Sequence, residues 1–262
     1  SRLADFNRDG SPDLLLLPKW STDRPYLYLN DGQGNFSDAR KIGLPDGLYG
    51  TGSQVRKPDG SGLEKGTGNW THSVADLNGD GYLDVIAAQV AWDDNTGKKY
   101  FSGQLQILVN NAGKGFTDET DTRLVASPLG AQNFTNYFDP QVVDLNGDGR
   151  PDLVVNVISA KGEYSNKVFI NTDGRLIESA DFSAPGLLFP VDTNGDGRID
   201  LVNLNYVIAG STSQGLGLFT PQVTTYLNSQ ATLRLSGSDG IDSLQGTSGH
   251  DVLRGLGGDD VL

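Results

Sequence analysis

Short apolar runs recur along the chain, and each one directly follows a cluster of Asp, Asn and Gly. The runs consist of aliphatic and β-branched residues, which favour strands buried in a sheet over helices. They occupy residues 14–17, 85–88, 153–158 and 201–208. The pattern therefore predicts an all-β fold in which one strand follows each polar cluster.

A second pattern trails each run. Residues 27–36, 107–116 and 168–177 read as a strand, a polar turn and a return strand, and residues 225–234 form a weaker fourth copy. Two strands around a short polar turn are typical of a β-hairpin. An asparagine stands in register at the turn of each copy: Asn30, Asn110, Asn171 and Asn228.

The polar clusters before the strands align without gaps as four nine-residue loops, 5–13, 76–84, 144–152 and 192–200. Each has oxygen-bearing side chains at positions one, three, five and nine, and Gly at position six. This Gly permits the positive φ that a sharp reversal of the chain needs. Asp, Asn and Gly are also ordinary turn formers, but four loops with one spacing favour a metal site over simple turns.

Calcium fits these loops because it takes about six to eight oxygen ligands from a tight loop. Position seven would add its backbone carbonyl. The loops are not EF-hands, since position twelve, where an EF-hand places a bidentate Glu, is apolar or Asn and strands follow. The predicted ligands are Asp5, Asn7, Asp9, Ser11 and Asp13; Asp76, Asn78, Asp80, Tyr82 and Asp84; Asp144, Asn146, Asp148, Arg150 and Asp152; and Asp192, Asn194, Asp196, Arg198 and Asp200.

One unit thus consists of a calcium loop, a strand, a variable insert and a hairpin. This arrangement resembles the FG-GAP/VCBS repeats of integrin-α-type β-propellers, where each unit is a four-stranded blade with calcium in the loop. The resemblance implies a partial propeller of four units over residues 1–233, the first of them truncated.

The repeat period changes to nine in residues 234–262, where Gly, Leu and Asp recur in a fixed register. These segments resemble the RTX nonapeptide repeats of parallel β-rolls, in which calcium lies between turns. The resemblance implies calcium ligands at Asp242, Asp251 and Asp260 and the start of a β-roll. It further implies a bacterial protein that leaves the cell by type I secretion.

Composition narrows the possible partners. The net charge is −13, with 33 acidic against 20 basic residues. This balance argues against a nucleic-acid partner, and no apolar run is long enough for membrane insertion. The chain contains no Cys, so disulfides cannot stabilise it and calcium is the expected substitute. It has no Met and both ends lie within repeats, so we expect a piece of a longer protein.

No catalytic motif is visible, so we expect no enzyme activity from these residues, although a catalytic domain could lie outside them. The inserts carry aromatic residues that could bind a glycan or a protein, and the candidates are Trp70, Trp92 and Tyr137. Packing beneath the long loops is the alternative role for these rings. For His72 we expect a surface or packing role.

These observations favour a calcium-binding extracellular module, either adhesive or structural, with self-assembly as one option. Two further hypotheses remain open. The chain could be the non-catalytic accessory domain of a secreted hydrolase, or a lectin-like propeller that binds glycans through its inserts.

Overall fold

We analysed a computed structural model of the chain. It describes residues 1–17, 25–45, 54–56, 63–65, 67–91, 103–125, 135–159, 163–179, 184–211, 217–229 and 232–233. Residues 234–262, with the predicted β-roll and its aspartates, lie outside the described residues. So does Trp92, and the side chain of Trp70 is likewise not described.

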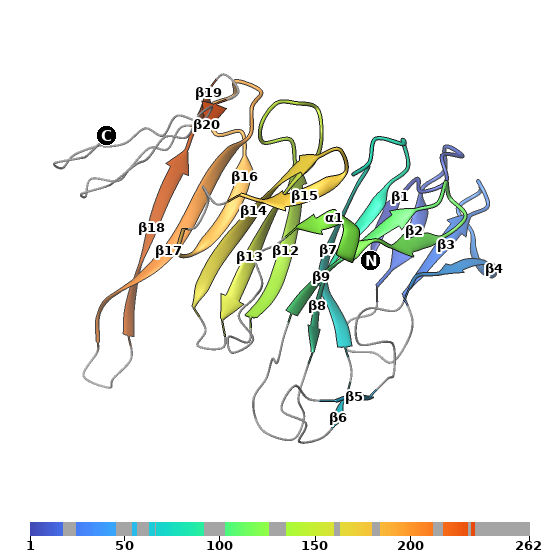
Figure 1. Cartoon of the computed structure of the whole chain (residues 1–262), viewed down its shortest axis with the longest axis horizontal. Coiled ribbons are helices and arrows are strands. Elements are labelled where there is room, and N and C mark those ends of the chain that lie inside the picture. The colour runs from blue at the N-terminus through green and yellow to red at the C-terminus, as the bar shows by residue number, and fades with distance from the viewer. Residues whose placement is uncertain are drawn as a thin grey trace.

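The described part of the chain is all-β apart from one short helix, as the apolar runs predict (Figure 1). Four main sheets carry the strand orders β1-β2-β3-β4, β10-β9-β8-β7, β11-β15-β14-β13-β12 and β16-β17-β18, here called the first to fourth sheets. Their strands are β1 (Arg2–Ala4), β2 (Asp13–Leu16), β3 (Tyr26–Asn30), β4 (Phe36–Gly43), β7 (Thr67–Ala75), β8 (Asp84–Ala91), β9 (Gly103–Asn110), β10 (Phe116–Asp118), β11 (Leu124–Val125), β12 (Thr135–Val143), β13 (Asp152–Ser159), β14 (Tyr164–Thr172), β15 (Arg175–Glu178), β16 (Leu187–Val191), β17 (Asp200–Ser211) and β18 (Gly217–Tyr226).

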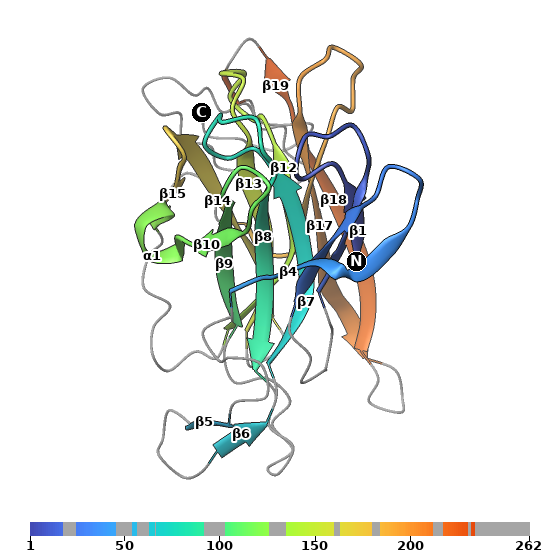
Figure 2. The ribbon, with the colours of Figure 1, turned by 90° about the vertical axis from the view of Figure 1, so that its right-hand side faces the viewer.

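The four sheets follow one another across the molecule in chain order (Figure 1). The first and fourth sheets lie at opposite ends, so the described sheets form an open row (Figure 1). Two small hairpins complete the described strands. They are β5 (Gln54–Arg56) with β6 (Leu63–Lys65), and β19 (Asn228–Ser229) with β20 (Thr232–Leu233). The β5–β6 hairpin projects beyond the lower end of the sheets (Figure 2).

The inner sheets are buried on both faces, which explains why their strands are continuous apolar runs. Successive side chains of a strand point to opposite faces. In β8, Val85 packs with Leu15 of the first sheet, whereas the next residue, Ile86, packs with Leu153 of the third sheet. The same alternation in β13 sends Val154 toward Leu201 of the fourth sheet.

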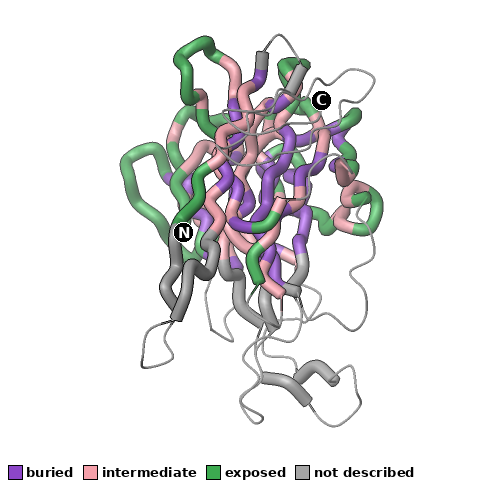
Figure 3. Tube along the Cα trace, turned by 90° about the vertical axis from the view of Figure 1, so that its left-hand side faces the viewer, coloured by how far each residue is buried: buried purple, intermediate pink, exposed green. Residues whose placement is uncertain are grey.

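Three hydrophobic layers therefore hold the row together, one between each pair of neighbouring sheets. Figure 3 shows the buried residues along the middle of the strands, with exposed residues in the loops beyond their ends. Burial of aliphatic side chains between sheets is the main source of stability in such a stack. Because each layer involves two sheets, each sheet depends on its neighbours.

A short segment after the second sheet crosses to the third. Helix α1 (Thr120–Arg123) follows the second sheet's last strand, and β11 then pairs in parallel with β15 of the third sheet. The third sheet thereby gains a fifth strand from the preceding unit. Within the described residues, no helix has the length and apolar character needed to cross a membrane.

His72 lies in β7, where burial lowers its pKa to about 4. The folded state therefore favours neutral imidazole, and its stability falls as pH drops from about 6.5 toward 4. We expect His72→Gln to remove about 2 kcal/mol of this loss. Urea unfolding of the wild-type chain and the His72→Gln variant at pH 7 and pH 4.5 measures this loss of stability in each. A wild-type-to-variant difference that does not change with pH would contradict this role.

Candidate metal centre

Each of the four acidic loops connects two neighbouring antiparallel strands of one main sheet: β1 to β2, β7 to β8, β12 to β13, and β16 to β17. The loop 76–84 joins β7 to β8, for example, and its last residue, Asp84, is the first residue of β8. Figures 1 and 2 show all four connections at the upper end of the sheets. The repeated sequence thus occupies one repeated place in the fold.

The carboxylate at position one organises each loop by accepting backbone N–H groups. In the second loop, Asp76 accepts from the amides of Asp80 at 3.1 Å and Gly81 at 2.7 Å. Gly81 has a φ of 86°, and this left-handed conformation lets the chain reverse around the carboxylate. The expected positive φ is confirmed at position six of every loop: Gly10, Gly81, Gly149 and Gly197.

Positions three and five hydrogen-bond each other. In the first loop the Asn7 amide donates to Asp9 Oδ2 at 2.9 Å, while Asn7 Oδ1 accepts from the Asp9 backbone at 3.0 Å. The hydrogen bond from Asn7 is the main reason why the pKa of Asp9 is lowered. A lowered pKa keeps this exposed carboxylate ionised, as a cation ligand must be.

The aspartate at position nine is buried instead of exposed. Asp84 is 0% exposed and accepts the backbone N–H of Leu77 at 2.9 Å and of Asn110 at 2.8 Å. Burial raises the pKa of Asp84 to about 6, and the same holds for Asp152. Position nine therefore ties the loop to the hairpin of its own sheet. In the other units, Asp13, Asp152 and Asp200 each accept the equivalent two backbone N–H groups, one from position two of the loop and one from the turn asparagine.

The donor set fits a hard cation, because every predicted ligand atom is an oxygen. Among the described residues, no three Asp, Glu or His side chains form a group that could hold a metal as they stand. The loop carboxylates instead accept N–H groups of their own backbone. A carboxylate oxygen that accepts one N–H retains a second lone pair. Calcium at positions one, three, five, seven and nine remains a prediction.

The turn asparagines join neighbouring sheets, a role that the sequence alone does not reveal. Asn110 is 2% exposed, and its Nδ2 donates to the Phe6 carbonyl of the first loop at 2.9 Å and to the Leu83 carbonyl at 3.0 Å. Its Oδ1 accepts from Gly113 at 2.8 Å. Each group of this buried amide is thus engaged, and one bond crosses to the preceding sheet.

The same bridge recurs at the next two junctions. Asn171 Nδ2 donates to the Leu77 carbonyl at 2.9 Å, and Asn228 Nδ2 donates to the Leu145 carbonyl at 2.6 Å. In every case the acceptor is position two of the preceding acidic loop. The loops therefore lie at the junctions between sheets, where any change in loop conformation also acts on the neighbouring sheet.

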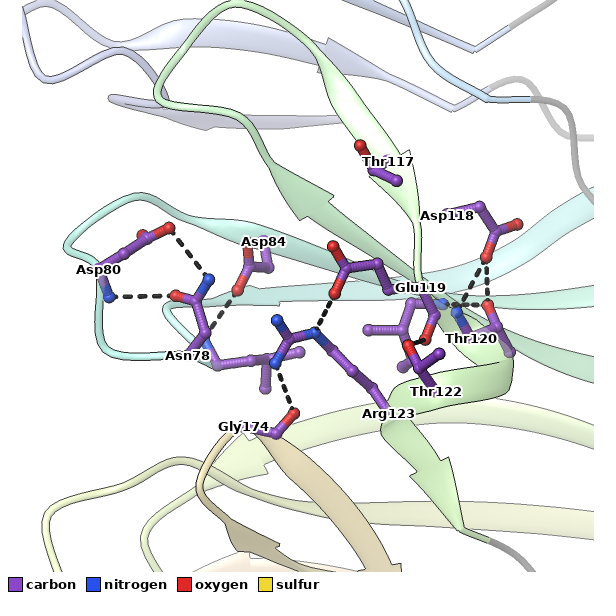
Figure 4. A network of polar contacts seen from close by, with 12 residues as sticks. Asn78, Asp80, Asp84, Thr117, Asp118, Glu119, Thr120, Thr122, Arg123 and Gly174 are labelled. Carbon is purple, nitrogen blue, oxygen red and sulfur yellow. Dashed lines mark hydrogen bonds and ion pairs between the residues drawn. The ribbon is translucent and has the colours of Figure 1, made fainter.

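Arg123 adds a further link between the second and third sheets (Figure 4). Its Nε donates to Glu119 Oε2 at 2.7 Å, and its Nη1 donates to the Gly174 carbonyl at 2.8 Å. Figure 4 shows the guanidinium between Glu119 and Gly174, beside Asn78 of the second loop. The crossing segment α1–β11 is anchored by this contact.

The structure corrects the role expected for Tyr137. Its ring is 3% exposed and lies in the hydrophobic layer between the second and third sheets. Burial raises the pKa of its hydroxyl. Tyr137 therefore contributes to packing and presents no ring to a ligand, whereas the expectations for Trp70 and Trp92 concern side chains outside the described set.

Gly113 allows the hairpin of the second sheet to approach the first loop. Its φ is 76°, and a Cβ there would lie 2.7 Å from Asn7 Cβ. We expect Gly113→Ala to destabilise the chain by about 2–3 kcal/mol, from a strained φ and a clash. Gly34→Ala is the matched control, because Gly34 has a φ of 89° and open space around it.

The control should lose only about 1 kcal/mol. Urea unfolding of the two variants measures the difference. Equal losses would contradict a close contact between the hairpin and the loop.

Comparisons with known proteins match both repeat types of this chain and two curated relatives. A model of the RTX calcium-binding nonapeptide repeat matches residues 236–262. Two curated proteins named T-cell immunomodulatory protein homolog are each 30% identical, one from Plasmodium yoelii yoelii over 152 residues and one from Plasmodium falciparum (isolate 3D7) over 138 residues. Each match covers 49% of this chain but only 21% and 18% of the relatives. The chain thus spans about a fifth of their length.

A model of the FG-GAP-like repeat matches residues 5–87 and 76–155. The two matches together span more than half of the chain and contain the first three acidic loops complete. The chain belongs to the FG-GAP-like repeat family.

Proposed function

We propose that this chain is a non-catalytic, calcium-stabilised repeat module that acts outside the cell in an adhesive or structural role. The observation that carries the proposal is the position of the acidic loops at the junctions between sheets. Through Asp84 and Asn110, for example, one loop is bonded to its own hairpin, and that hairpin is bonded to the preceding loop. A ligand of the loops would therefore act on the whole row.

Bound calcium would supply positive charge at the exposed oxygens of each loop. The residues of the chain do the rest. Position one holds the amides of the turn, and position nine fixes the start of the second strand. Without a cation, the carboxylates at positions one and five repel each other across a short loop. Binding energy at the loops would thus become folding energy.

We also propose that the four sheets are consecutive blades of a β-propeller and that residues 234–262 form an RTX β-roll. Family membership and the row of four similar sheets support the first part. The nonapeptide match supports the second. Two calcium-dependent repeat types in one chain favour a place outside the cell, where calcium is abundant, and RTX repeats suit a bacterial protein exported by type I secretion.

Recognition of a glycan or protein through the inserts has weaker support, because Tyr137 is a core residue. The accessory domain of a secreted hydrolase remains a second candidate, and it differs from the first only in what is attached to the module. The relatives carry an immunomodulatory name, but the matched share of their length is small, and we propose no such role here.

Calcium affinity tests the proposed location. Extracellular calcium modules bind with Kd values of about 10⁻⁴–10⁻³ M, whereas intracellular sensors bind at about 10⁻⁷–10⁻⁵ M. We expect the melting temperature to begin rising only as calcium reaches the higher range, measured by melting across a calcium titration, because stabilisation becomes appreciable once calcium exceeds Kd. A melting temperature that already rises at submicromolar calcium would contradict a protein built for the outside of the cell.

A further inference from the structure

The fourth acidic loop contains two side chains, those of Thr193 and Arg198, that donate hydrogen bonds to predicted calcium ligands of the same loop. Thr193 is at position two, where the other loops have Phe6, Leu77 or Leu145. Arg198 is at position seven, where only the backbone carbonyl is a predicted ligand. Neither side chain is needed to hold the metal, so each can compete with a cation for the carboxylate that it contacts.

Arg198 occupies the carboxylate at position five. Its Nη2 donates to Asp196 Oδ2 at 2.7 Å, and Asn194 Nδ2 donates to the same oxygen at 3.1 Å. A carboxylate oxygen has two lone pairs, so these two donors use the full capacity of this oxygen. The Nε of Arg198 also donates to the Asn228 carbonyl at 2.9 Å, which holds the guanidinium beside the loop.

The third loop also has an arginine at position seven, but its guanidinium is held elsewhere. Arg150 Nη2 forms an ion pair with Asp173 Oδ1, in the hairpin turn of the third sheet, at 2.9 Å. Among the described residues, Asp148 Oδ2 at position five accepts only the Asn146 amide, at 3.2 Å. The third loop is therefore a matched comparison, because it has the same residue types at positions five and seven but a different partner for the arginine.

The carboxylate at position nine of the fourth loop also accepts an extra donor. Asp200 Oδ2 accepts the backbone N–H of Thr193 at 2.9 Å and, in addition, the Thr193 hydroxyl. In the third loop, Asp152 Oδ2 accepts the backbone N–H of Leu145 at 2.9 Å, and leucine has no hydroxyl to add. Two of the three carboxylates in the fourth loop thus have an oxygen with both lone pairs engaged.

We propose that Arg198 and Thr193 make the fourth loop a weaker calcium site than the third, by at least about tenfold in Kd. The inference rests on the proposed binding of calcium by the loops. A cation that is to bind these two oxygens must first displace a guanidinium and a hydroxyl. Charge-assisted hydrogen bonds are the stronger ones, so the calcium-free fourth loop is stabilised relative to the calcium-free third loop. The positive charge of Arg198 also repels a cation at close range.

The difference between the two loops sets an order of calcium binding along the row. As calcium rises, the third loop fills before the fourth. Asn228 Nδ2 donates to the Leu145 carbonyl of the third loop at 2.6 Å, so filling of the third loop acts first on the junction with the fourth sheet. The fourth sheet gains the contribution of its own loop only at higher calcium.

A calcium titration of the ¹⁵N-labelled full chain, followed by NMR, measures the two loops separately. The position-six amides are matched reporters, because Gly149 N–H donates to Asp144 Oδ2 at 2.8 Å and Gly197 N–H donates to Asp192 Oδ2 at 2.9 Å. Each signal reports on its own loop, so calcium held by the nonapeptide repeats does not enter. In the wild-type chain, the midpoint for Gly197 should lie at least about tenfold higher in free calcium than the midpoint for Gly149.

Single substitutions assign the difference to the two side chains. Arg198→Met keeps the length of the side chain but removes its donors, and should lower the Gly197 midpoint about tenfold. Thr193→Val removes only the hydroxyl and should lower that midpoint about threefold. Arg150→Met is the matched control, and it should change the Gly149 midpoint less than about twofold, because this arginine pairs with a carboxylate outside its loop.

The possible outcomes separate this proposal from the proposed function. Equal midpoints for Gly149 and Gly197 in the wild-type chain would overturn the proposal while calcium binding by the loops stands, and this comparison needs no substitution. An unchanged Gly197 midpoint in Arg198→Met would overturn it too, as would an equal gain at Gly149 from Arg150→Met. If neither glycine signal responds to calcium, the proposed function itself is contradicted, and the proposal falls with it.

Discussion

Asp152→Asn should destabilise the chain by about 3–5 kcal/mol, although it changes one oxygen to nitrogen. Asp152 is fully buried and accepts the backbone N–H of Leu145 at 2.9 Å and of Asn171 at 2.8 Å. Asn has one acceptor oxygen, which can still accept one of these two backbone N–H groups. Its NH₂ group would face the other N–H, and these two facing donors would be buried without an acceptor. Such a loss is a large part of the total stability of a domain.

The charge of Asp152 is not the cause of this effect. Burial raises its pKa to about 6, so the folded protein favours the carboxylate less than water does. Removing the charge alone would cost little. The loss therefore comes from the geometry of the two accepted hydrogen bonds.

Asp148→Asn is the matched control, since Asp148 is exposed in the same loop and accepts the Arg150 amide at 2.8 Å. Both substitutions remove one carboxylate from the same predicted calcium site. Urea unfolding at one fixed calcium concentration should show a larger loss for Asp152→Asn by about 3 kcal/mol. Equal losses would mean that position nine is only a metal ligand.

Removal of calcium should have the largest effect. A site saturated at 100 times its Kd contributes about 2.7 kcal/mol, so four loops contribute about 10 kcal/mol. For a domain of this size we expect the melting temperature to fall by at least about 20 °C in excess EDTA. Differential scanning calorimetry with calcium and with EDTA measures the change, and magnesium added to the EDTA sample checks for a general cation effect. An unchanged melting temperature would show that the loops are not structural metal sites.

Local sequence patterns predict the elements of this fold well. The apolar run 153–158 lies within β13, and residues 168–177 form the expected hairpin of β14 and β15. Position-six glycines adopt the expected positive φ. These features are local, because period, turn chemistry and backbone conformation are set within a few residues.

Contacts between distant residues were not predictable in the same way. Asn110 and Phe6 are 104 residues apart, and no local pattern connects a turn asparagine to a carbonyl in another unit. The register of the four asparagines indicates only a turn. The sequence predicts Tyr137 in an insert that could bind a ligand, whereas β12 carries it into the layer between two sheets. Burial of position nine likewise depends on how sheets stack.

Bound calcium per chain, counted at saturation by equilibrium dialysis and mass spectrometry, tests directly whether the loops hold metal. The comparison is between wild-type chain and a variant with Ala at position five of every loop: Asp9, Asp80, Asp148 and Asp196. The RTX repeats remain in both, so their calcium cancels in the difference. We expect the variant to bind four calcium ions fewer, and Asp148→Ala alone to bind one fewer. Equal calcium in all three proteins would contradict calcium binding by the loops.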